Sequence, residues 1–241
     1  MTIQPAEELP ETIVIGVLAL QGAFIEHINY LQRLRPAGHT IRAIPVKNVE
    51  ELSQVRALVI PGGESTVISS LAFLTTGLLP ALLEFVQDPS RAVWGTCAGM
   101  ILMAEEDGVG GGRKKGVKGW AGMKGLKVWR NLYGTQLESF EAPLLVPSLS
   151  SPSKPFNTIF IRAPAVHSLS PSTATEILAT LPSDLIPPPP PSDSPLGESN
   201  PDDLGKVMIK QGKKMVTSFH PELSGDTRVH EFWVEKCVLG R

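Results

Sequence analysis

The sequence lacks the features that mark secreted or membrane-spanning proteins. It has 241 residues but only two cysteines, Cys97 and Cys237, which excludes a disulfide framework and favours a reducing compartment. The apolar run at residues 12–20 is too short to cross a bilayer. The first residues lack the basic start and apolar core of a secretory signal. We therefore expect a cytoplasmic protein with no membrane partner.

The chain also lacks a large excess of charge of one sign. The 22 Lys and Arg residues nearly balance the 24 Asp and Glu residues, for a formal net charge of −2. One short basic cluster, Arg113-Lys114-Lys115 with Lys118, lies among glycines and is typical of a solvated loop rather than a nucleic-acid surface. No His/Cys cluster has the spacing of a zinc site. We expect no nucleic-acid partner, no metal and no cofactor.

What the sequence does have is an alternating pattern in its first half. Short apolar runs at residues 13–20, 41–46, 57–60 and 92–94 predict strands, and periodic segments at 24–34, 66–74, 79–87 and from 98 to 105 predict helices. This alternation is typical of an open α/β fold, a three-layer α/β/α arrangement around a mixed, mostly parallel sheet. Ligands bind such sheets beyond the carboxyl ends of the strands.

The second half is less regular, with strands predicted at residues 127–129, 158–162, 207–211 and 215–219. Two segments rich in proline and serine, at 147–155 and 183–203, have a composition that packs no core, so we expect mobile insertions. The second could be a plain surface insertion or a proline-rich ligand for a partner. We interpret residues 1–241 as a single domain that carries both insertions.

Cys97 lies in the stretch Gly95-Thr-Cys-Ala-Gly99, directly after a predicted strand. This fits the Gly-x-nucleophile-x-Gly elbow between a strand and a helix, in which the nucleophile is exposed and the next amide faces an oxyanion. We expect Gly95 to permit the turn and Gly99 to let the helix pack close to the strand. A packed thiol at a tight turn fits this stretch equally well.

A cysteine nucleophile needs a base and an orienting group. His220 follows the predicted strand at 215–219, and Glu222 comes two positions later, close enough to hold the imidazole. A histidine at a strand end beside a solvated carboxylate is the plainer alternative. The remaining histidines have no comparable context and are interpreted as structural or surface residues: His27, His39, His167 and His230.

Further candidates lie at other strand ends. The turn Pro61-Gly-Gly-Glu-Ser65 could supply backbone amides to an oxyanion, or could be a simple turn with Ser65 as the helix cap. Arg130 and Arg162 each end a predicted strand and could bind a ligand carboxylate, although a surface ion pair is the commoner role of such residues.

Together these residues resemble a known family. Gly95-x-Cys97-x-Gly99 followed by His220-Pro-Glu222 is similar to the triad of class I glutamine amidotransferases, which have a flavodoxin-like fold. The stretches GVLALQGAFIEHI, LVIPGGEST, WGTCAGMILMA, NLYGTQLESFEAP, FIRAP and SFHPEL resemble the glutaminase subunits of pyridoxal 5′-phosphate synthase, the PdxT/SNO family.

The resemblance implies an activity and roles for individual residues. It implies hydrolysis of L-glutamine to glutamate and ammonia, with the ammonia passed to a separate synthase subunit in a large hetero-oligomeric complex for vitamin B6 biosynthesis. Cys97 would be the nucleophile, His220 the acid and base, and Glu222 its orienting group. The implied glutamine-binding residues are Gly63, Glu64, Ser65, Arg130, Ile161 and Arg162. The Gly63 and Ala98 amides would bind the oxyanion, and Gln21 would arrange the Gly63 loop when the synthase docks.

The chain departs from the family pattern in places. Thr135 stands where the family usually has arginine, the segment at 108–119 looks longer than in compact bacterial members, and the two insertions resemble enlarged, fungal-like forms. Two other functions stay open: an independent γ-glutamyl hydrolase with the same triad, and an inactive regulatory subunit, against which the intact triad argues.

Overall fold

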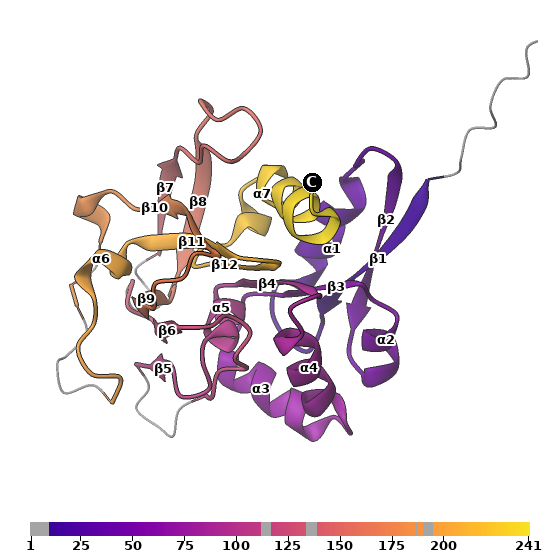
Figure 1. Ribbon diagram of the computed structural model, residues 1–241, viewed down its shortest axis with the longest axis horizontal. Helices are drawn as coiled ribbons and strands as arrows, with labels where there is room; N and C mark the ends of the chain where they lie inside the picture. Colours follow the sequence, from indigo (N-terminus) through magenta and orange to yellow (C-terminus); the bar gives the residue numbers. More distant parts are fainter. Residues whose placement is uncertain (1–9, 112–116, 134–138, 187, 190–194) are drawn as a thin grey trace, which may run out of the picture.

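A seven-stranded sheet forms the centre of the computed structural model, in the order β10-β11-β12-β4-β3-β1-β2 (Figure 1). The structure describes residues 10–111, 117–133, 139–186, 188–189 and 195–241. Five adjacent strands pair in parallel, and β11 and β10 are added at one edge by antiparallel pairing, so that only β11 runs in the opposite direction. The strands of this sheet are β1 (Glu11–Leu18), β2 (His39–Val46), β3 (Ala57–Ile60), β4 (Ala92–Thr96), β10 (Thr175–Thr180), β11 (Lys206–Gln211) and β12 (Lys214–Thr217).

Helices cover both faces of this sheet. One face carries α1 (Phe24–Arg33) and α7 (Arg228–Trp233), which continues as a π-helix over Val234–Leu239. The other carries α2 (Val49–Ser53), α3 (Ser65–Leu74), α4 (Leu78–Gln87) and α5 (Ala98–Met103), as Figure 1 shows. The expected three-layer, mostly parallel architecture is therefore confirmed.

The alternation of side chains along the strands explains the two apolar layers. Ile13, Ile15 and Val17 of β1 enter a core with α1 and α7, whereas Leu18 enters the core on the opposite face. Because neighbouring residues of a strand point to opposite faces, a sheet covered on both sides needs continuously apolar strands, which is what residues 13–18 provide.

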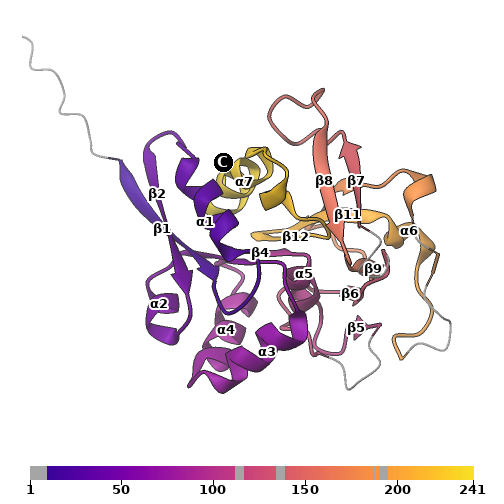
Figure 2. The same cartoon turned by 180° about the vertical axis from the view of Figure 1, so that it is seen from behind.

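Two small sheets extend the molecule on the side of β10 and β11, which is the left in Figure 1 and the right in Figure 2. They are formed by β5 (Val109–Gly110), β6 (Leu126–Trp129) and β9 (Ala165–Leu169), and by β7 (Ser139–Leu144) with β8 (Phe156–Ile161). Sequence reasoning missed β5, β7, β9 and β10, and it extended the helix after Cys97 to residue 105, although α5 ends at Met103.

The segment at 147–155 is packed, contrary to its composition. Leu149 is buried, and the Arg228 guanidinium donates hydrogen bonds to the carbonyl groups of Ser150, Ser151, Lys154 and Pro155 at 2.9–3.2 Å. One buried arginine thus adds to the backbone hydrogen bonds of the loop itself, such as that from the Lys154 amide to the Ser151 carbonyl at 2.9 Å.

The segment at 183–203 is ordered at both ends. It begins with a 3₁₀ turn at Ser183–Leu185 and ends in α6 (Pro201–Leu204), where Asp203 is buried and accepts hydrogen bonds from Lys206 and the Leu169 amide. Three residues of the proline run, Pro187, Pro190 and Pro191, lie outside the described residues, as do the basic cluster at 113–115 and Thr135.

Among the described residues, no single helix is long and apolar enough to cross a membrane. The pair α3 and α4 meets the length and composition limits only when taken together, and these helices are bent by 118° at their junction.

Candidate active site

A cavity of about 190 Å³ opens at the carboxyl ends of the parallel strands. The strand register explains the convergence, because Ile60 of β3 and Val216 of β12 both pair with Gly95 of β4. The turns that follow these three strands therefore meet. The cavity is lined by Gly63, Glu64, Ser65, Cys97, Ala98, Ile101, Arg130, Asn131, Ile161, Arg162 and His220.

Cys97 forms the elbow between β4 and α5. Its backbone has φ 48° and ψ −106°, a strained conformation for a residue with a side chain, and its amide donates to the Thr217 carbonyl at 2.8 Å. Such strain at a cavity wall points to a functional residue rather than a packed thiol. The elbow therefore favours the nucleophile interpretation of this stretch.

The two flanking glycines are needed for close approach. A Cβ atom at Gly99 would lie 1.9 Å from the Ile60 carbonyl oxygen, and one at Gly95 would lie 2.4 Å from the Gly99 carbonyl oxygen. Gly99 therefore acts as expected. Gly95 also permits the turn, by leaving room for the Gly99 carbonyl rather than by its own φ, since Gly95 lies within β4 and Cys97 has the positive φ.

His220 lies at the cavity wall, with Glu222 behind it. His220 Nδ1 is 2.7 Å from Glu222 Oε1, and the backbone amide of His220 donates to the Ile159 carbonyl at 2.8 Å. Burial lowers the pKa of His220, but hydrogen bonding and charge interaction with Cys97 and Glu222 outweigh it and raise the pKa to about 10. The imidazolium form is thus stabilised at neutral pH.

Glu222 is only 2% exposed, yet it is held as a carboxylate. Burial acts to raise its pKa, but the neighbouring His27 and His220 outweigh burial, so the net pKa lies well below that of a free glutamate. A buried carboxylate beside an imidazole fixes the ring tautomer and stabilises positive charge on the ring.

Sequence reasoning missed His27. Its side chain is fully buried, and its Nε2 atom lies 3.3 Å from Glu222 Oε2. No local pattern marks it, because residues 27 and 222 are brought together only by the packing of α1 against the 3₁₀ turn Pro221–Leu223.

The loop after β3 is held by the segment after β1. Gln21 Oε1 accepts a hydrogen bond from the Glu64 amide at 2.7 Å, and the Ala23 amide donates to the Gly62 carbonyl at 3.2 Å. The alternative in which Ser65 caps the helix is wrong, since Glu64 occupies the cap position of α3, without a side-chain cap bond, and Ser65 is the first helical residue.

Arg130, Asn131 and Arg162 also line the cavity. Asn131 and Arg162 have φ values of 55° and 48°, so that, with Cys97, three of the five non-glycine residues with positive φ in the described chain surround this cavity. The Nε atom of Arg130 is buried and has no hydrogen-bond partner among the described residues. Asn131 and Ile101 were not predicted; the strained backbone that marks Asn131 is not visible in sequence.

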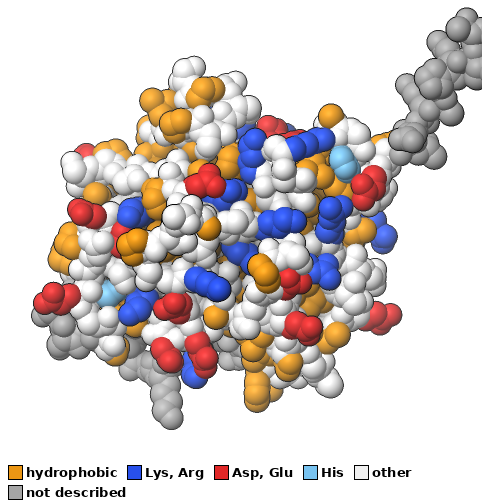
Figure 3. All heavy atoms as spheres, viewed as in Figure 1, with side chains coloured by type: hydrophobic (Ala, Val, Ile, Leu, Met, Phe, Trp, Pro, Cys, Tyr) orange, Lys and Arg blue, Asp and Glu red, His pale blue; other side chains and the backbone are white. Residues whose placement is uncertain are grey.

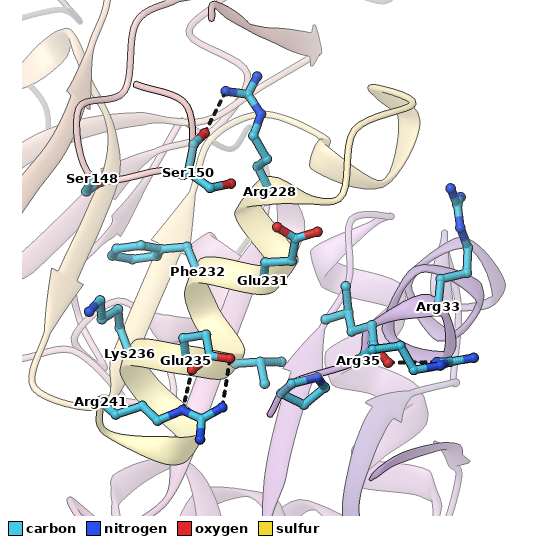
Figure 4. A pocket seen from close by; sticks show the side chains of 13 residues that line it. Arg33, Arg35, Ser148, Ser150, Arg228, Glu231, Phe232, Glu235, Lys236 and Arg241 are labelled. Atoms are coloured by element: carbon cyan, nitrogen blue, oxygen red, sulfur yellow. Dashed lines mark hydrogen bonds and ion pairs between the residues drawn. The ribbon is translucent and has the colours of Figure 1, made fainter. Parts of the chain in front are cut away.

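A larger cavity, of about 690 Å³, lies elsewhere, between the ends of α1 and α7 and the 147–155 segment. Figure 3 shows Lys and Arg side chains gathered over this face, and Figure 4 shows their contacts. Arg241 is paired with Glu235, Arg35 donates to two carbonyl groups at the end of α1, and Arg228 holds the 147–155 loop. These cations stabilise helix ends and a loop, so the cavity has a structural explanation.

Metal ligation finds no support in the part of the chain that the structure describes, where no group of three or more His, Cys, Asp or Glu side chains could hold an ion. The groups that this site brings together for chemistry are its thiol, imidazole and carboxylate.

Comparison with known proteins agrees with this arrangement. A sequence profile of the SNO glutamine amidotransferase family matches residues 17–239. The probable pyridoxal 5′-phosphate synthase subunit PDX2 of Arabidopsis thaliana is 39% identical over 236 residues, covering 92% of this chain and 85% of the relative. The pyridoxal 5′-phosphate synthase subunit SNO1 of Saccharomyces cerevisiae is 37% identical and covers 93% of each chain.

A solved structure described as a glutamine amidotransferase is 37% identical and superposes with a TM-score of 0.69, covering 94% of this chain and 99% of that one. A putative GMP synthase component from Thermoplasma acidophilum is 13% identical with a TM-score of 0.58 and covers 94% of each chain, which shows a shared fold only. The resemblance seen in the sequence is confirmed, and the chain belongs to the SNO glutamine amidotransferase family.

Proposed function

We propose that this chain is the glutaminase subunit of a pyridoxal 5′-phosphate synthase, with Cys97, His220 and Glu222 as its catalytic triad. The observation that carries the proposal is the arrangement of the triad at the cavity: an elbow cysteine, a histidine with a raised pKa and a buried carboxylate 2.7 Å from that histidine. Family membership and the names of the relatives support the assignment of the synthase.

In the reaction, the Cys97 thiolate attacks the side-chain amide carbon of L-glutamine. The backbone amides of Gly63 and Ala98 bind the oxyanion of the tetrahedral intermediate. His220 donates a proton to the departing ammonia, which leaves a γ-glutamyl thioester on Cys97. His220 then takes a proton from water, which attacks the thioester and releases glutamate, so that the Cys97 thiolate and the His220 imidazolium are regenerated.

The cavity suits a zwitterionic amino acid. Its size, about 190 Å³, lies below the range of drug-sized pockets and fits a small metabolite. The Nε of Arg130, which has no hydrogen-bond partner among the described residues, is available with Arg162 to the substrate carboxylate, and Glu64 can accept from the substrate ammonium group. Ser65 and Ile161 complete the glutamine site in this proposal.

The synthase partner docks, in this proposal, over the mouth of the cavity. Ile25, Ile161 and Leu223 are 37–52% exposed although they are apolar, and they belong to segments that border the site. Gln21, bonded to the Glu64 amide, is placed to transmit docking to the loop that carries Gly63. We propose residues 1–241 as one amidotransferase domain working in a large complex around the synthase.

The test is ammonia release from L-glutamine by the full chain, with and without its cognate synthase. Cys97→Ala should abolish release, whereas Cys237→Ala, at the other buried cysteine, should not. A folded Cys97→Ala protein that still releases ammonia at the parent rate would overturn the mechanism. Equal activity with and without the synthase would instead favour an independent γ-glutamyl hydrolase.

A further inference from the structure

The triad carboxylate is contacted on both of its oxygen atoms. Glu222 Oε1 binds His220 Nδ1 at 2.7 Å, and Glu222 Oε2 lies 3.3 Å from His27 Nε2. The side chains of Glu222 and His27 are both 0% exposed, so water does not compete for this contact. Among the described residues Oε2 has no partner with full hydrogen-bond geometry, which leaves His27 as the nearby donor.

His27 is itself held by a second buried histidine. His27 Nδ1 lies 2.9 Å from His230 Nε2 of α7, and His27 Nε2 is also 3.3 Å from the Thr96 hydroxyl of β4. Aromatic rings pack around the two histidines. The ring centroids of His27 and Trp94 are 5.5 Å apart in an edge-on arrangement, and those of His230 and Tyr30 are 4.8 Å apart. The His27 ring is therefore fixed by contacts from three elements.

The direction of the protons follows from the surroundings of His230. Burial holds the pKa of His230 well below its usual range, so its ring is neutral. Its Nδ1 is buried without a partner among the described residues. A buried N–H without an acceptor is rare, which places the single proton of His230 on Nε2, where it donates to His27 Nδ1.

His27 must then carry its proton on Nε2, facing Glu222. A doubly protonated His27 would set its Nδ1–H against the Nε2–H of His230, and a form with a bare Nε2 atom would set a lone pair against a carboxylate oxygen. The form protonated on Nε2 gives Glu222 a donor on its second oxygen.

We propose that His27 is a positioning residue of the active site, which holds Glu222 through Oε2 so that Oε1 stays aligned with His220, while His230 fixes the tautomer of His27. This inference rests on the proposed function. A carboxylate anchored on both oxygens keeps its orientation as charge develops on the imidazole, and such preorganisation is what an orienting group contributes to catalysis.

The position of His27 also joins the two halves of the site. It lies one turn into α1, whose preceding segment carries Gln21, the acceptor for the Glu64 amide. One short segment thus contacts both the loop with Gly63 and the carboxylate behind His220. If partner docking shifts the start of α1, the shift changes the contacts of both the loop with Gly63 and the Glu222 carboxylate.

A matched pair of substitutions separates positioning from packing. The amide nitrogen of His27→Gln can occupy the place of Nε2 and still donate to Glu222, whereas His27→Asn reaches only the place of Nδ1. His167→Gln is the control, since His167 is a buried histidine that packs on Trp129, away from the cavity. Thermal melting of all variants monitors folding.

We expect His27→Asn to lower kcat for glutamine hydrolysis on the order of 10-fold in the complex with the synthase, a scale seen for groups that orient a reactive imidazole. KM should stay within about 2-fold, because no group of the glutamine pocket is changed. His27→Gln should recover most of the loss, and His167→Gln should behave like the parent chain.

The pH profile provides the second measurement. The charged or titratable groups near His220 and His27 are Cys97, Glu222 and His230, together with Glu64, Arg130 and Arg162 of the same cavity. Loss of Glu222 alignment weakens the contact that raises the pKa of His220, so the alkaline limb of kcat/KM should move to lower pH in His27→Asn and not in His167→Gln.

A double-mutant cycle tests whether His27 acts through Glu222. If His27 acts through Glu222, adding His27→Asn to Glu222→Gln should cost little further activity. Full additivity, or an equal loss in His27→Asn and His27→Gln with an unmoved pH profile, would overturn the proposal. These outcomes are independent of the Cys97→Ala test, in which the proposed function itself would fail.

Discussion

At the scale of single residues, the two cysteines of this chain differ in surroundings rather than in burial. Cys97 lies at a strained elbow on the cavity wall, beside the imidazole of His220. Cys237 is packed in the apolar core next to α7, and burial raises the pKa of its thiol to about 12. Reactivity follows the thiolate, so these positions should behave differently.

We predict that iodoacetamide modifies Cys97 in the folded chain while Cys237 stays unmodified until the chain is denatured. Peptide mass spectrometry after timed labelling at neutral pH measures both sites at once. Labelling of Cys237 at the rate of Cys97 in the native protein would contradict the assigned environments.

We predict that Glu222→Gln shifts the alkaline limb of the pH–activity profile to lower pH, by about one pH unit or more. The sign follows from charge: the carboxylate is one of the groups that raise the pKa of His220 to about 10, so its loss lowers that pKa, and the imidazolium is lost earlier as pH rises. The profile of kcat/KM measures this, and an unmoved alkaline limb would contradict it.

The residues that sequence reasoning found are those with local patterns. Cys97 stands between glycines at a strand end, and His220 and Glu222 are two positions apart. His27 could not be found in this way, because its contacts with Glu222 and His230 join residues far apart in the chain, and His230 lies 203 positions from it. The interpretation of His27 as a structural or surface histidine is incomplete for this reason.

At the scale of elements, the parallel strands were predictable and the later ones were not. β1, β3 and β4 are continuous apolar runs, which is the pattern of strands buried on both faces. β7 and β10 have mixed, partly exposed residues, with no such run. The composition of 147–155 was equally misleading, because the residue that holds this loop, Arg228, lies in α7.

We predict that Arg228→Met destabilises the protein by about 3 kcal/mol, since the hydrogen bonds from a buried guanidinium to four carbonyl groups are lost. Arg33→Met, at an exposed position of α1, is the control and should change the stability by less than about 0.5 kcal/mol. Urea unfolding gives the stability, and amide exchange at 147–155 should rise only in Arg228→Met. Protected amides there would contradict the anchoring role.

We predict that Gly99→Ala destabilises the protein more than Gly212→Ala. An added Cβ at Gly99 would lie 1.9 Å from the Ile60 carbonyl oxygen. At Gly212 an added Cβ would meet open space, and only the backbone φ of 58° is unfavourable for a residue with a side chain. The expected costs are about 3 kcal/mol or more against ~1–2 kcal/mol. Equal midpoints in urea would mean that the elbow is not as tightly packed as the structure shows.

At the scale of the whole molecule, the carboxyl ends of the central parallel strands supply the triad and the loop with Gly63, while Arg130, Ile161 and Arg162 come from the small sheets. The turns after β3, β4 and β12 meet at these strand ends, α1 and α7 hold the carboxylate from one face, and the cation-lined larger cavity is elsewhere. The apolar side chains at the mouth remain available to a partner. Activity of this chain alone should therefore be low and should increase when the synthase is added.

The central claim, that Cys97 carries the glutamyl group during turnover, can be tested by trapping that group. The full chain with its cognate synthase is mixed with L-glutamine, quenched in acid within the first turnovers and analysed by peptide mass spectrometry. The account predicts the mass of a γ-glutamyl group on the peptide that contains Cys97 and no such addition on the peptide with Cys237. Continued ammonia release with Cys97 unmodified at every quench time, including in variants slowed at His220, would contradict it.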